Sequence, residues 1–366
     1  MRRFLLILIP TLLLIACDPN GGNQPQVDDF DRQAMLTHWA DKLIIPAFSE
    51  LVSTTEALET AANSFSDTPN ETTLASLRQA WETAYLQWQS ASAFEVGKAE
   101  EVRLRDNLNI YPVDVEELKE NVESGSYNLV LPSLNDSQGF PALDYLLYGV
   151  GESDTEILAI YTSDALAVNY RQYLVDLAVR INSLVKEVEA DWKGDYRDTF
   201  VENNGSNANA SVDLMVNDYI FYYEKHLRAG KVGIPAGVFS GAVLPENVEA
   251  YYRRDLSKKL LNAALDASQV FFNGEVSETG PSLKAYLDYL ESDKDGERLS
   301  NKINAQFEAS RSAIASLPDD FVSQLNDNEV PMLAAYDQLQ LNVVLLKVDM
   351  LQALNVNVDY VDADGD

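Results

Sequence analysis

Apolar residues recur every three or four positions through most of this chain, which is the spacing of one face of an α-helix. The first long helix is predicted over residues 38–65, and Pro46 inside it predicts a kink or a later start. The next helix begins after Thr68, which we expect to be its cap, with Pro69 in the first helical position and Glu71 completing a capping box. Both predicted helices carry apolar residues along one side, as the helices of a bundle do.

Helical spacing continues along the rest of the chain, and strand-like alternation is nearly absent. Asp114 can cap a short helix, and residues 356–361 are predicted to form a short strand or an extended tail. The helix predicted over 328–354 is apolar nearly all round from residue 333 to 354 and should be central. The other predicted helices span 115–122, 139–149, 154–192, 211–227, 246–273, 280–291 and 297–316. The pattern therefore predicts an all-α fold.

A polar segment, Asn203–Asn207, marks a loop near the middle of the chain. The helical content on its two sides is similar. We therefore predict two helical-bundle halves, residues 32–200 and 201–366, as duplicated four-helix-bundle-like domains, although no residue-level repeat proves the duplication. Residues 230–245 are rich in Gly and Pro but also apolar, which suits an ordered, partly buried loop.

The beginning of the chain has the features of a lipoprotein signal peptide. In residues 1–17, two arginines precede an apolar run too short to span a bilayer, and the final four residues match a bacterial lipobox. We expect a lipid on Cys17, the only cysteine, and a flexible tether over 18–31. The alternative is an ordinary signal peptide with an incidental cysteine.

The expected location is the bacterial cell envelope, facing the periplasm or the surface. Asp18 favours the inner membrane under one sorting rule, and the choice between inner and outer membrane stays open.

The chain is strongly acidic. Its formal net charge is −31, and removal of the two leader arginines would take this to about −33. Such a charge argues against nucleic acid or anionic lipid as a partner, since both bind basic surfaces. It permits cation binding without showing it, because a solvated acidic surface is the commoner explanation.

Most enzyme signatures are absent from the sequence. There is no His-Glu-x-x-His, no Gly-x-Ser-x-Gly and no Gly-rich lysine loop for phosphate. The two histidines are His38 and His226, and His38 has only Asp41 one helical turn away. A segment that starts like a calcium loop at Glu291 has Lys302 where the glutamate ligand belongs, so we interpret it as a turn.

His226 is the better candidate because the segment Tyr222–Lys231 places it beside Glu224 and three cations at a predicted helix end. This cluster indicates either an anion or metal pocket, or cations that offset the helix dipole, and we favour the second explanation slightly. Tyrosines near such a pocket would offer oxygen ligands for ferric iron, although buried tyrosines more often belong to the core.

The stretch Gly139–Gly149 is a short apolar helix that carries one acid, Asp144. A buried acid needs a partner, so Asp144 is either a capped structural group or part of a site.

This stretch resembles the segment Gly-x-His-Ala-Ile-Glu-Phe-Leu-Leu-x-Gly of the imelysin family of bacterial surface and periplasmic proteins. Both glycines and the apolar frame match, but Pro141 stands in place of the histidine and Asp144 in place of the glutamate. Residues 109–114 resemble the family's Asn-x-Trp-Pro-Leu-Asp, and 81–97 resemble its tryptophan-containing second helix. The resemblance extends from about residue 35 to the end and is strongest over 74–149.

The resemblance implies two helical bundles with a cleft between related halves, and an association with iron acquisition. Some members are called insulin-cleaving peptidases, which need a metal or an activated water. Pro141 has no side-chain lone pair, so half of the family's proposed metal pair is lost, and we discount peptidase activity. Our preferred hypothesis is a lipid-anchored, non-catalytic binding component of iron acquisition, with iron-uptake proteins as partners. The alternatives are a metallopeptidase with relocated ligands and a structural or protein-interaction lipoprotein.

Eight residues are predicted to line the cleft. The metal candidates are Asp144 and His226, with iron or another divalent cation as the cofactor, and the ligand itself cannot be named from the sequence. The predicted cleft residues are Arg105, Tyr111, Asp114, Asp144, Tyr145, Glu224, His226 and Arg228.

Overall fold

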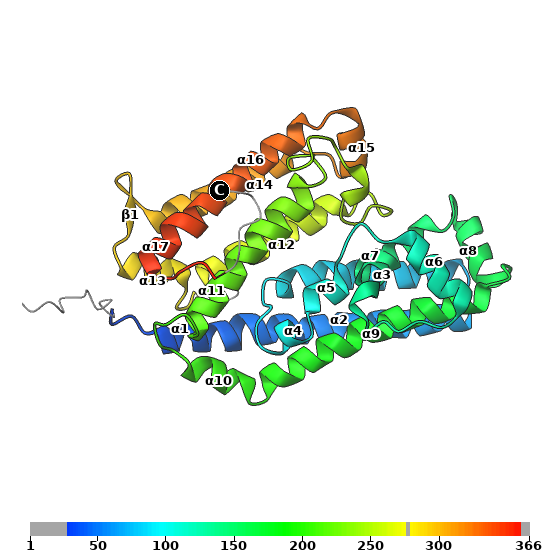
Figure 1. Ribbon diagram of the computed structural model, residues 1–366, viewed down its shortest axis with the longest axis horizontal. Helices are drawn as coiled ribbons and strands as arrows, with labels where there is room; N and C mark the ends of the chain where they lie inside the picture. Colours follow the sequence, from blue (N-terminus) through cyan, green and yellow to red (C-terminus); the bar gives the residue numbers. More distant parts are fainter. Residues whose placement is uncertain (1–27, 276–278, 360–366) are drawn as a thin grey trace, which may run out of the picture. The chain divides into compact units, whose positions relative to one another are not determined.

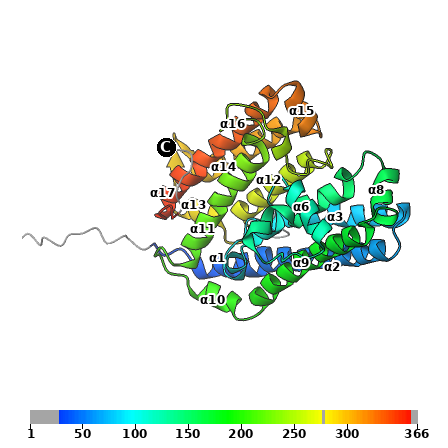
Figure 2. The same cartoon turned by 45° about the vertical axis from the view of Figure 1, so that its right-hand side comes forward.

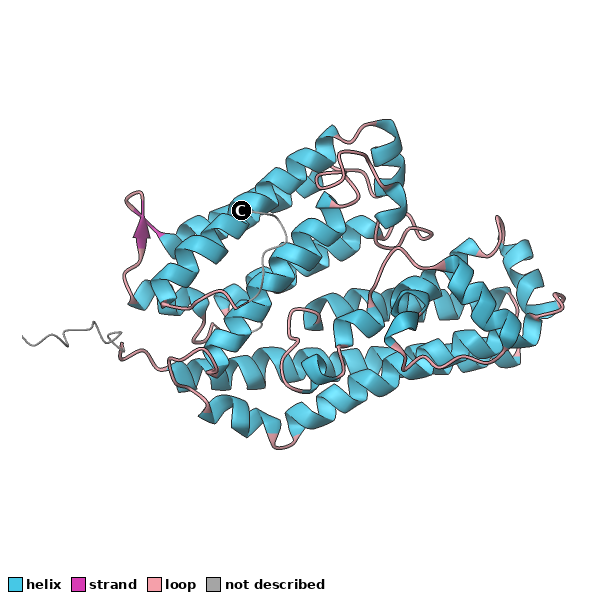
Figure 3. Cartoon of the chain, viewed as in Figure 1, coloured by secondary structure: helices cyan, strands magenta, loops and turns pink. Residues whose placement is uncertain are grey.

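The computed structural model describes residues 28–275 and 279–359, and most of this part is helical (Figure 3). The strands in these two ranges are β1 (Asp293–Lys294) and β2 (Glu297–Arg298), which form one short antiparallel hairpin. The prediction of an all-α fold is therefore confirmed. The predicted signal peptide with Cys17 and most of the tether lie outside the described residues.

The first half of the chain contains three long helical runs, and most of its shorter helices lie between the second and the third. In chain order the elements are α1 (Arg32–His38), the π-helical η1 (Trp39–Ile44), α2 (Ile45–Asp67), α3 (Glu71–Ala91), α4 (Lys98–Glu101), α5 (Leu104–Leu108), α6 (Val115–Ser124), the 3₁₀ turn η2 (Pro132–Ser137), α7 (Gly139–Asp144), the π-helical η3 (Tyr145–Gly149), α8 (Asp154–Thr162), α9 (Ala167–Lys193) and α10 (Tyr196–Glu202).

The second half consists of four longer helical runs with short helices at their ends. These elements are α11 (Ser211–Phe221), the π-helical η4 (Tyr222–Gly233), the 3₁₀ turn η5 (Pro245–Asn247), α12 (Ser257–Asn273), α13 (Leu283–Tyr289), α14 (Leu299–Ala315), α15 (Phe321–Asp327), α16 (Val330–Val344), the π-helical η6 (Leu345–Met350) and α17 (Leu351–Leu354).

Two groups of helices form the core. In the first group α2 packs along α3 and α9, and in the second α14 and α16 pack with η4 and α12 (Figures 1 and 2). The two groups meet where α3 packs against α12. Residues 31–366 form one compact unit, and the predicted division into 32–200 and 201–366 stays a prediction. Among the helices described, none has the length and apolarity to cross a bilayer.

Pro46 does not delay the first long helix, which begins at Arg32, earlier than predicted. Proline lacks an N–H, and its ring crowds the carbonyl one turn earlier in an α-helix. Here the π-helical turn η1 lies just before it, closed by a bond from the Ile45 N–H to the Ala40 carbonyl. The wider turn moves the preceding carbonyls out of α-helical register, so the helix continues through the proline.

The cap of α3 is Asn70, and the predicted cap at Thr68 is wrong. The Asn70 side chain accepts hydrogen bonds from the N–H groups of Thr72 and Thr73, at 2.9 and 3.1 Å. Thr73 completes the capping box, since its hydroxyl accepts from the Asn70 N–H at 3.1 Å. Asparagine is a stronger N-cap than threonine, so the helix starts two residues later than expected.

Two other predicted helices are shorter than the apolar pattern indicated. The segment 154–192 is interrupted after Thr162, where the Asp164 carboxylate accepts from the Leu166 N–H at 2.7 Å and competes with the helical hydrogen bonds. The helix predicted over 246–273 begins only at Ser257, because the preceding backbone N–H groups bond to a side chain elsewhere in the chain, as described below.

The last long helix is less central than predicted. It runs from Val330 through η6 to Leu354, and Leu341, Val344 and Val348 are exposed by 40 to 55% on its outer side. The helix predicted over 211–227 continues to Gly233, so the start of the expected Gly-rich loop is helical. Residues 356–359 form no strand, and 360 and 361 lie outside the described residues.

The predicted helix Gly139–Gly149 is confirmed as α7 followed by η3. Gly139 has a φ of +76°, and a Cβ there would lie 2.3 Å from the Leu108 carbonyl oxygen at the end of α5. Only glycine allows both the conformation and the close approach. This contact places Asp144 near the junction between the two helical groups.

The contribution of the Asn70 cap to stability can be tested by mutation. Asn70→Ala removes a side-chain acceptor for two N–H groups of α3 and should lower the free energy of unfolding by about 1 kcal/mol. The matched control Thr68→Ala changes an exposed neighbour and should stay within about 0.5 kcal/mol of wild type. Urea unfolding followed by circular dichroism measures both. Equal losses in the two variants would show that Asn70 is not the principal cap.

Candidate functional site

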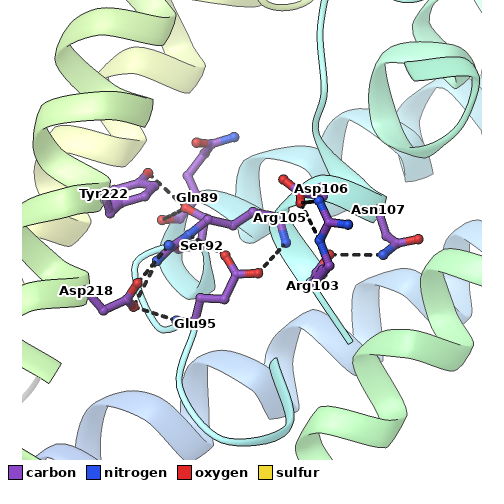
Figure 4. A network of polar contacts seen from close by, with 9 residues as sticks. All are labelled: Gln89, Ser92, Glu95, Arg103, Arg105, Asp106, Asn107, Asp218 and Tyr222. Atoms are coloured by element: carbon purple, nitrogen blue, oxygen red, sulfur yellow. Dashed lines mark hydrogen bonds and ion pairs between the residues drawn. The ribbon is translucent and has the colours of Figure 1, made fainter. Parts of the chain in front are cut away.

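A buried ion pair joins α5 to α11 (Figure 4). The Arg105 guanidinium donates to both carboxylate oxygens of Asp218, from Nη1 at 2.8 Å and from Nη2 at 2.9 Å. Its Nε donates to the Ser92 carbonyl oxygen at 2.6 Å. Arg105 is only 6% exposed, so these bonds replace the water that it loses on burial.

Glu95 is the second acid beside Arg105. Its Oε2 lies 3.1 Å from the Arg105 Nε, and its backbone N–H donates to the Asp218 carboxylate at 2.7 Å. Burial raises the pKa of Glu95 to about 7, the Arg105 charge lowers it in part, and the Asp218 charge raises it further. The cluster therefore holds one cation between two acids, of which Asp218 makes the bidentate contact.

A pocket of about 210 Å³ lies beside this ion pair, between α3, the segment around α5, and η4. We call it the cationic pocket because Arg105, Lys225 and Lys231 line it and, among the described residues, no carboxylate does. The full lining is Trp88, Gln89, Ser92, Arg105, Asn109, Ile110, Tyr111, Tyr222, Lys225, His226, Gly230, Lys231, Ile234 and Asn247.

Lys231 is held by a second buried ion pair. Its ammonium group donates to Glu249, and the side chains of both residues are almost fully buried, at 4 and 2% exposure. Asn109 links this pair to the first helical group, because its amide donates to Glu249 at 2.8 Å and its Oδ1 accepts from the Tyr85 hydroxyl at 2.6 Å. The acids thus lie behind the pocket wall, and the lysine and arginine side chains form the wall itself.

His226 faces this pocket as a neutral ring. It stacks on Tyr222 with an interplanar angle of 18° and packs edge-on against Phe221. Burial, followed by the charges of Arg105 and Lys231, lowers the pKa of His226 to about 3. At neutral pH the imidazole is therefore uncharged and keeps one donor and one acceptor nitrogen.

The π-helical form of η4 helps to gather these side chains. Tyr222, His226 and Lys231 follow one another at intervals of four and five residues, the spacing that a turn with i→i+5 hydrogen bonds keeps on one face. Tyr111 approaches this face closely, since a Cβ on Gly230 would lie 3.2 Å from its hydroxyl. A glycine at this position leaves room for the Tyr111 side chain.

Asp144 has a structural partner in the second half of the chain. Its Oδ2 accepts from the Tyr252 N–H at 2.8 Å, and its Oδ1 accepts from the Arg253 N–H at 2.9 Å. Burial raises the pKa of Asp144 to about 7, although these bonds and the Arg253 charge lower it in part. These bonds explain why residues before Ser257 are not helical, and Pro141 lines the same small cavity of about 90 Å³.

The structure brings three of the predicted cleft residues together around the cationic pocket, namely Arg105, Tyr111 and His226. Tyr111 also lines the cavity beside Asp144, which is therefore a neighbouring site. The two metal candidates, Asp144 and His226, line different pockets. Over residues 28–275 and 279–359 no group of three His, Cys, Asp or Glu side chains is placed to hold a metal ion.

The remaining predicted residues have other contacts. Asp114 caps α6 by accepting from the Glu117 N–H at 3.0 Å, as predicted from the sequence. Tyr145 packs edge-on against Tyr252, with ring centroids 5.2 Å apart.

Glu224 and Arg228 face the interior of the second helical group instead of the cationic pocket. Glu224 pairs with Lys347 of η6 at 2.9 Å, and Arg228 donates to the Tyr336 hydroxyl of α16 at 2.9 Å. Glu224 is two residues after Tyr222, so on a helix it points to the opposite side.

Sequence reasoning missed the acids that hold the pocket together. Asp218 precedes Tyr222 and His226 at intervals of four residues, so helical spacing would have placed it on their face. Glu249 has no such signal, because it lies in an irregular segment and meets Lys231 only in the folded chain.

The fold and this site define an all-α protein with a cationic pocket where two groups of helices meet. The family model Peptidase_M75, described as Imelysin, matches residues 44–347. This chain belongs to the imelysin family.

Two solved structures share the fold. One is a putative iron-regulated protein A precursor from Parabacteroides distasonis ATCC 8503, with a TM-score of 0.71 and 18% identity over 87% of this chain and 94% of that one. The other is an imelysin-like protein from Psychrobacter arcticum 273-4, with a TM-score of 0.67 and 17% identity over 90% of this chain and 97% of that one. No curated protein matches the chain.

The contacts of Asp144 predict a pH-dependent contribution to stability. Asp144→Asn places an amide NH₂ against one of two backbone N–H groups and should cost about 1 to 3 kcal/mol at pH 7. The pKa of Asp144 is higher in the folded protein than its ordinary value of 3.8. Its carboxyl group therefore contributes most to the free energy of unfolding below pH 3.8, and this contribution is lost as the pH rises to about 7. The deficit of the variant should therefore grow on acidification, by at most about 1.4 kcal/mol per pH unit.

Urea unfolding of wild type and variant at several pH values between 4 and 8 checks this expectation. The exposed Asp67→Asn is the control, and its difference from wild type should not follow the same curve. A constant difference for Asp144→Asn across this range would contradict the raised pKa.

Proposed function

We propose that this protein is a non-catalytic binding component of bacterial iron acquisition, held in the cell envelope by a lipid on Cys17. Membership of the imelysin family supports the association with iron, as does the fold shared with a protein described as iron-regulated. The observation that carries the proposal is the cationic pocket, which is lined by three cations and several aromatic rings. Such a lining suits an anionic ligand, for example an iron chelate with carboxylate groups.

The contacts of the motif residues support a non-catalytic role. A hydrolytic metal site needs about three protein ligands and an open coordination position. Pro141 supplies no ligand, and both oxygens of Asp144 accept backbone hydrogen bonds. Asp144 therefore acts as a joint between the helical groups in this proposal, and the metallopeptidase with relocated ligands is not favoured.

The pocket also bears on the third hypothesis, a structural or protein-interaction lipoprotein. Tyrosines and lysines line it, but they leave about 210 Å³ of space. The lipid anchor, the envelope location and partners among iron-uptake proteins rest on the N-terminal sequence and on the family alone.

Binding and expression test the proposal together. Transcription of the gene should rise on iron starvation, and the purified mature chain should bind ferric citrate in a calorimetric titration. Ile234→Trp fills the mouth of the pocket and should weaken that binding at least tenfold, whereas the distant Lys186→Gln should not. Labelling cells with a radioactive fatty acid tests the lipid on Cys17.

Three results would count against the proposal. Cleavage of insulin B chain that EDTA abolishes would favour a metallopeptidase. Unchanged transcription on iron starvation, together with no binding of ferric citrate or ferrous ion, would remove the link to iron. Equal affinity in Ile234→Trp and wild type would place the binding site elsewhere.

A further inference from the structure

We infer that the cationic pocket binds a small aromatic carboxylate, in which the ring lies among the aromatic side chains and the carboxylate meets the lysines. The inference rests on the proposed function and specifies the ligand of the same pocket. It is argued from the charge, the shape and the rings of the lining.

The charge of the lining selects an anion. Lys225 and Lys231 come from η4, and each is paired with an acid that does not line the pocket, Glu224 at 3.2 Å for Lys225 and Glu249 for Lys231. An ammonium group carries three N–H donors, so a pair with an acid is compatible with a further hydrogen bond from the same group. A carboxylate accepts hydrogen bonds from several donors at once and would accept from both lysines.

Two contacts of Arg105 determine its part in the anion site. Its guanidinium binds Asp218 in a bidentate manner and lies 5.4 Å from the centre of the Tyr222 ring (Figure 4). The charge of Arg105 is therefore balanced by its acids, and its side chain forms a rigid wall of the pocket without binding the ligand through both of its NH₂ groups. The lysines are left as the direct partners of a carboxylate.

The aromatic residues select a flat apolar group. Trp88, Tyr111, Tyr222 and His226 all line the pocket, and His226 already stacks on Tyr222 with centroids 6.0 Å apart. Rings stack well on other rings in offset or edge-on arrangements. An aliphatic acid or inorganic phosphate would satisfy the lysines but would leave these ring faces without a matching surface.

The volume limits the size of the ligand. Pockets for drug-sized molecules measure roughly 300 to 1,000 Å³, and this one measures about 210 Å³. A single substituted benzene ring is therefore the largest aromatic unit that fits. The neutral His226 ring offers one donor to such a ligand, because burial, followed by the charges of Arg105 and Lys231, lowers its pKa to about 3.

The ligand class also connects the pocket to iron by its own chemistry. A benzoate with a hydroxyl group beside the carboxylate chelates ferric iron through the phenolate and carboxylate oxygens. Salicylate is the simplest molecule of this kind. A protein that holds such a ring would bind a free chelator or one end of a larger chelate that protrudes from the pocket.

A matched set of probes separates charge from shape. Calorimetric titration of the full mature chain with salicylate and benzoate should show saturable binding. Benzamide has the same ring without the charge, and acetate has the charge without the ring, so each should bind at least tenfold more weakly than benzoate. Inorganic phosphate should bind more weakly than benzoate as well.

Variants locate the binding site. Lys225→Gln should weaken benzoate binding about tenfold and leave the weak benzamide binding unchanged, whereas Lys225→Arg keeps the charge and should retain most of the affinity. Lys186→Gln removes a surface cation with 46% exposure and is the control. Circular dichroism and the melting temperature of each variant show whether it is folded before its affinity is compared.

The outcomes separate this inference from the proposed function. Equal affinity for benzoate and benzamide, tighter binding of phosphate than benzoate, or an affinity that Lys225→Gln leaves unchanged in a folded protein would each overturn the inference. Binding of ferric citrate without binding of benzoate or salicylate would overturn the inference and leave the proposed function in place. Binding of benzoate by a protein that shows no response to iron would overturn the proposed function and leave the inference in place.

Discussion

The buried ion pair between Arg105 and Asp218 is the interaction on which the site depends. Moving two charges out of water is costly, and only further hydrogen bonds make such a pair stable. Here the Ser92 carbonyl and the Glu95 carboxylate supply them, so the guanidinium is held in one orientation. Because Arg105 comes from α5 and Asp218 from α11, the same bonds align the first and second helical groups. The cationic pocket exists in the space that this alignment leaves.

Two other buried contacts also hold the first and second helical groups together. Lys231 and Glu249 form a second ion pair, which Asn109 connects to the first helical group. Asp144 accepts two backbone N–H groups from the irregular segment before α12. The carboxylate of Asp144 thus joins two parts of the fold.

Much of this architecture could be predicted from local sequence, and the errors share a physical cause. Periodicity located the long helices because the burial of one face repeats with the helical turn. The boundaries were wrong where a side chain competed with the helical hydrogen bonds, as Asp164 does, or where Asn70 was a better cap than Thr68. In the site, Arg105, Tyr111 and His226 line one pocket, whereas Glu224 and Arg228 turn toward α16 and η6 because they occupy the opposite face of the helix.

The sequence by itself determined the all-α class and the family, because helical periodicity and a short glycine-bounded motif are local properties of the chain. Only the tertiary structure decided which charges meet. Asp144 and its partner Tyr252 are 108 residues apart, and Arg105 and Asp218 are 113 apart. No local pattern encodes such pairs, since an acid gains a partner only when packing removes both groups from water. In the packed structure the lysines of η4 line the pocket, whereas the acids that pair with them do not.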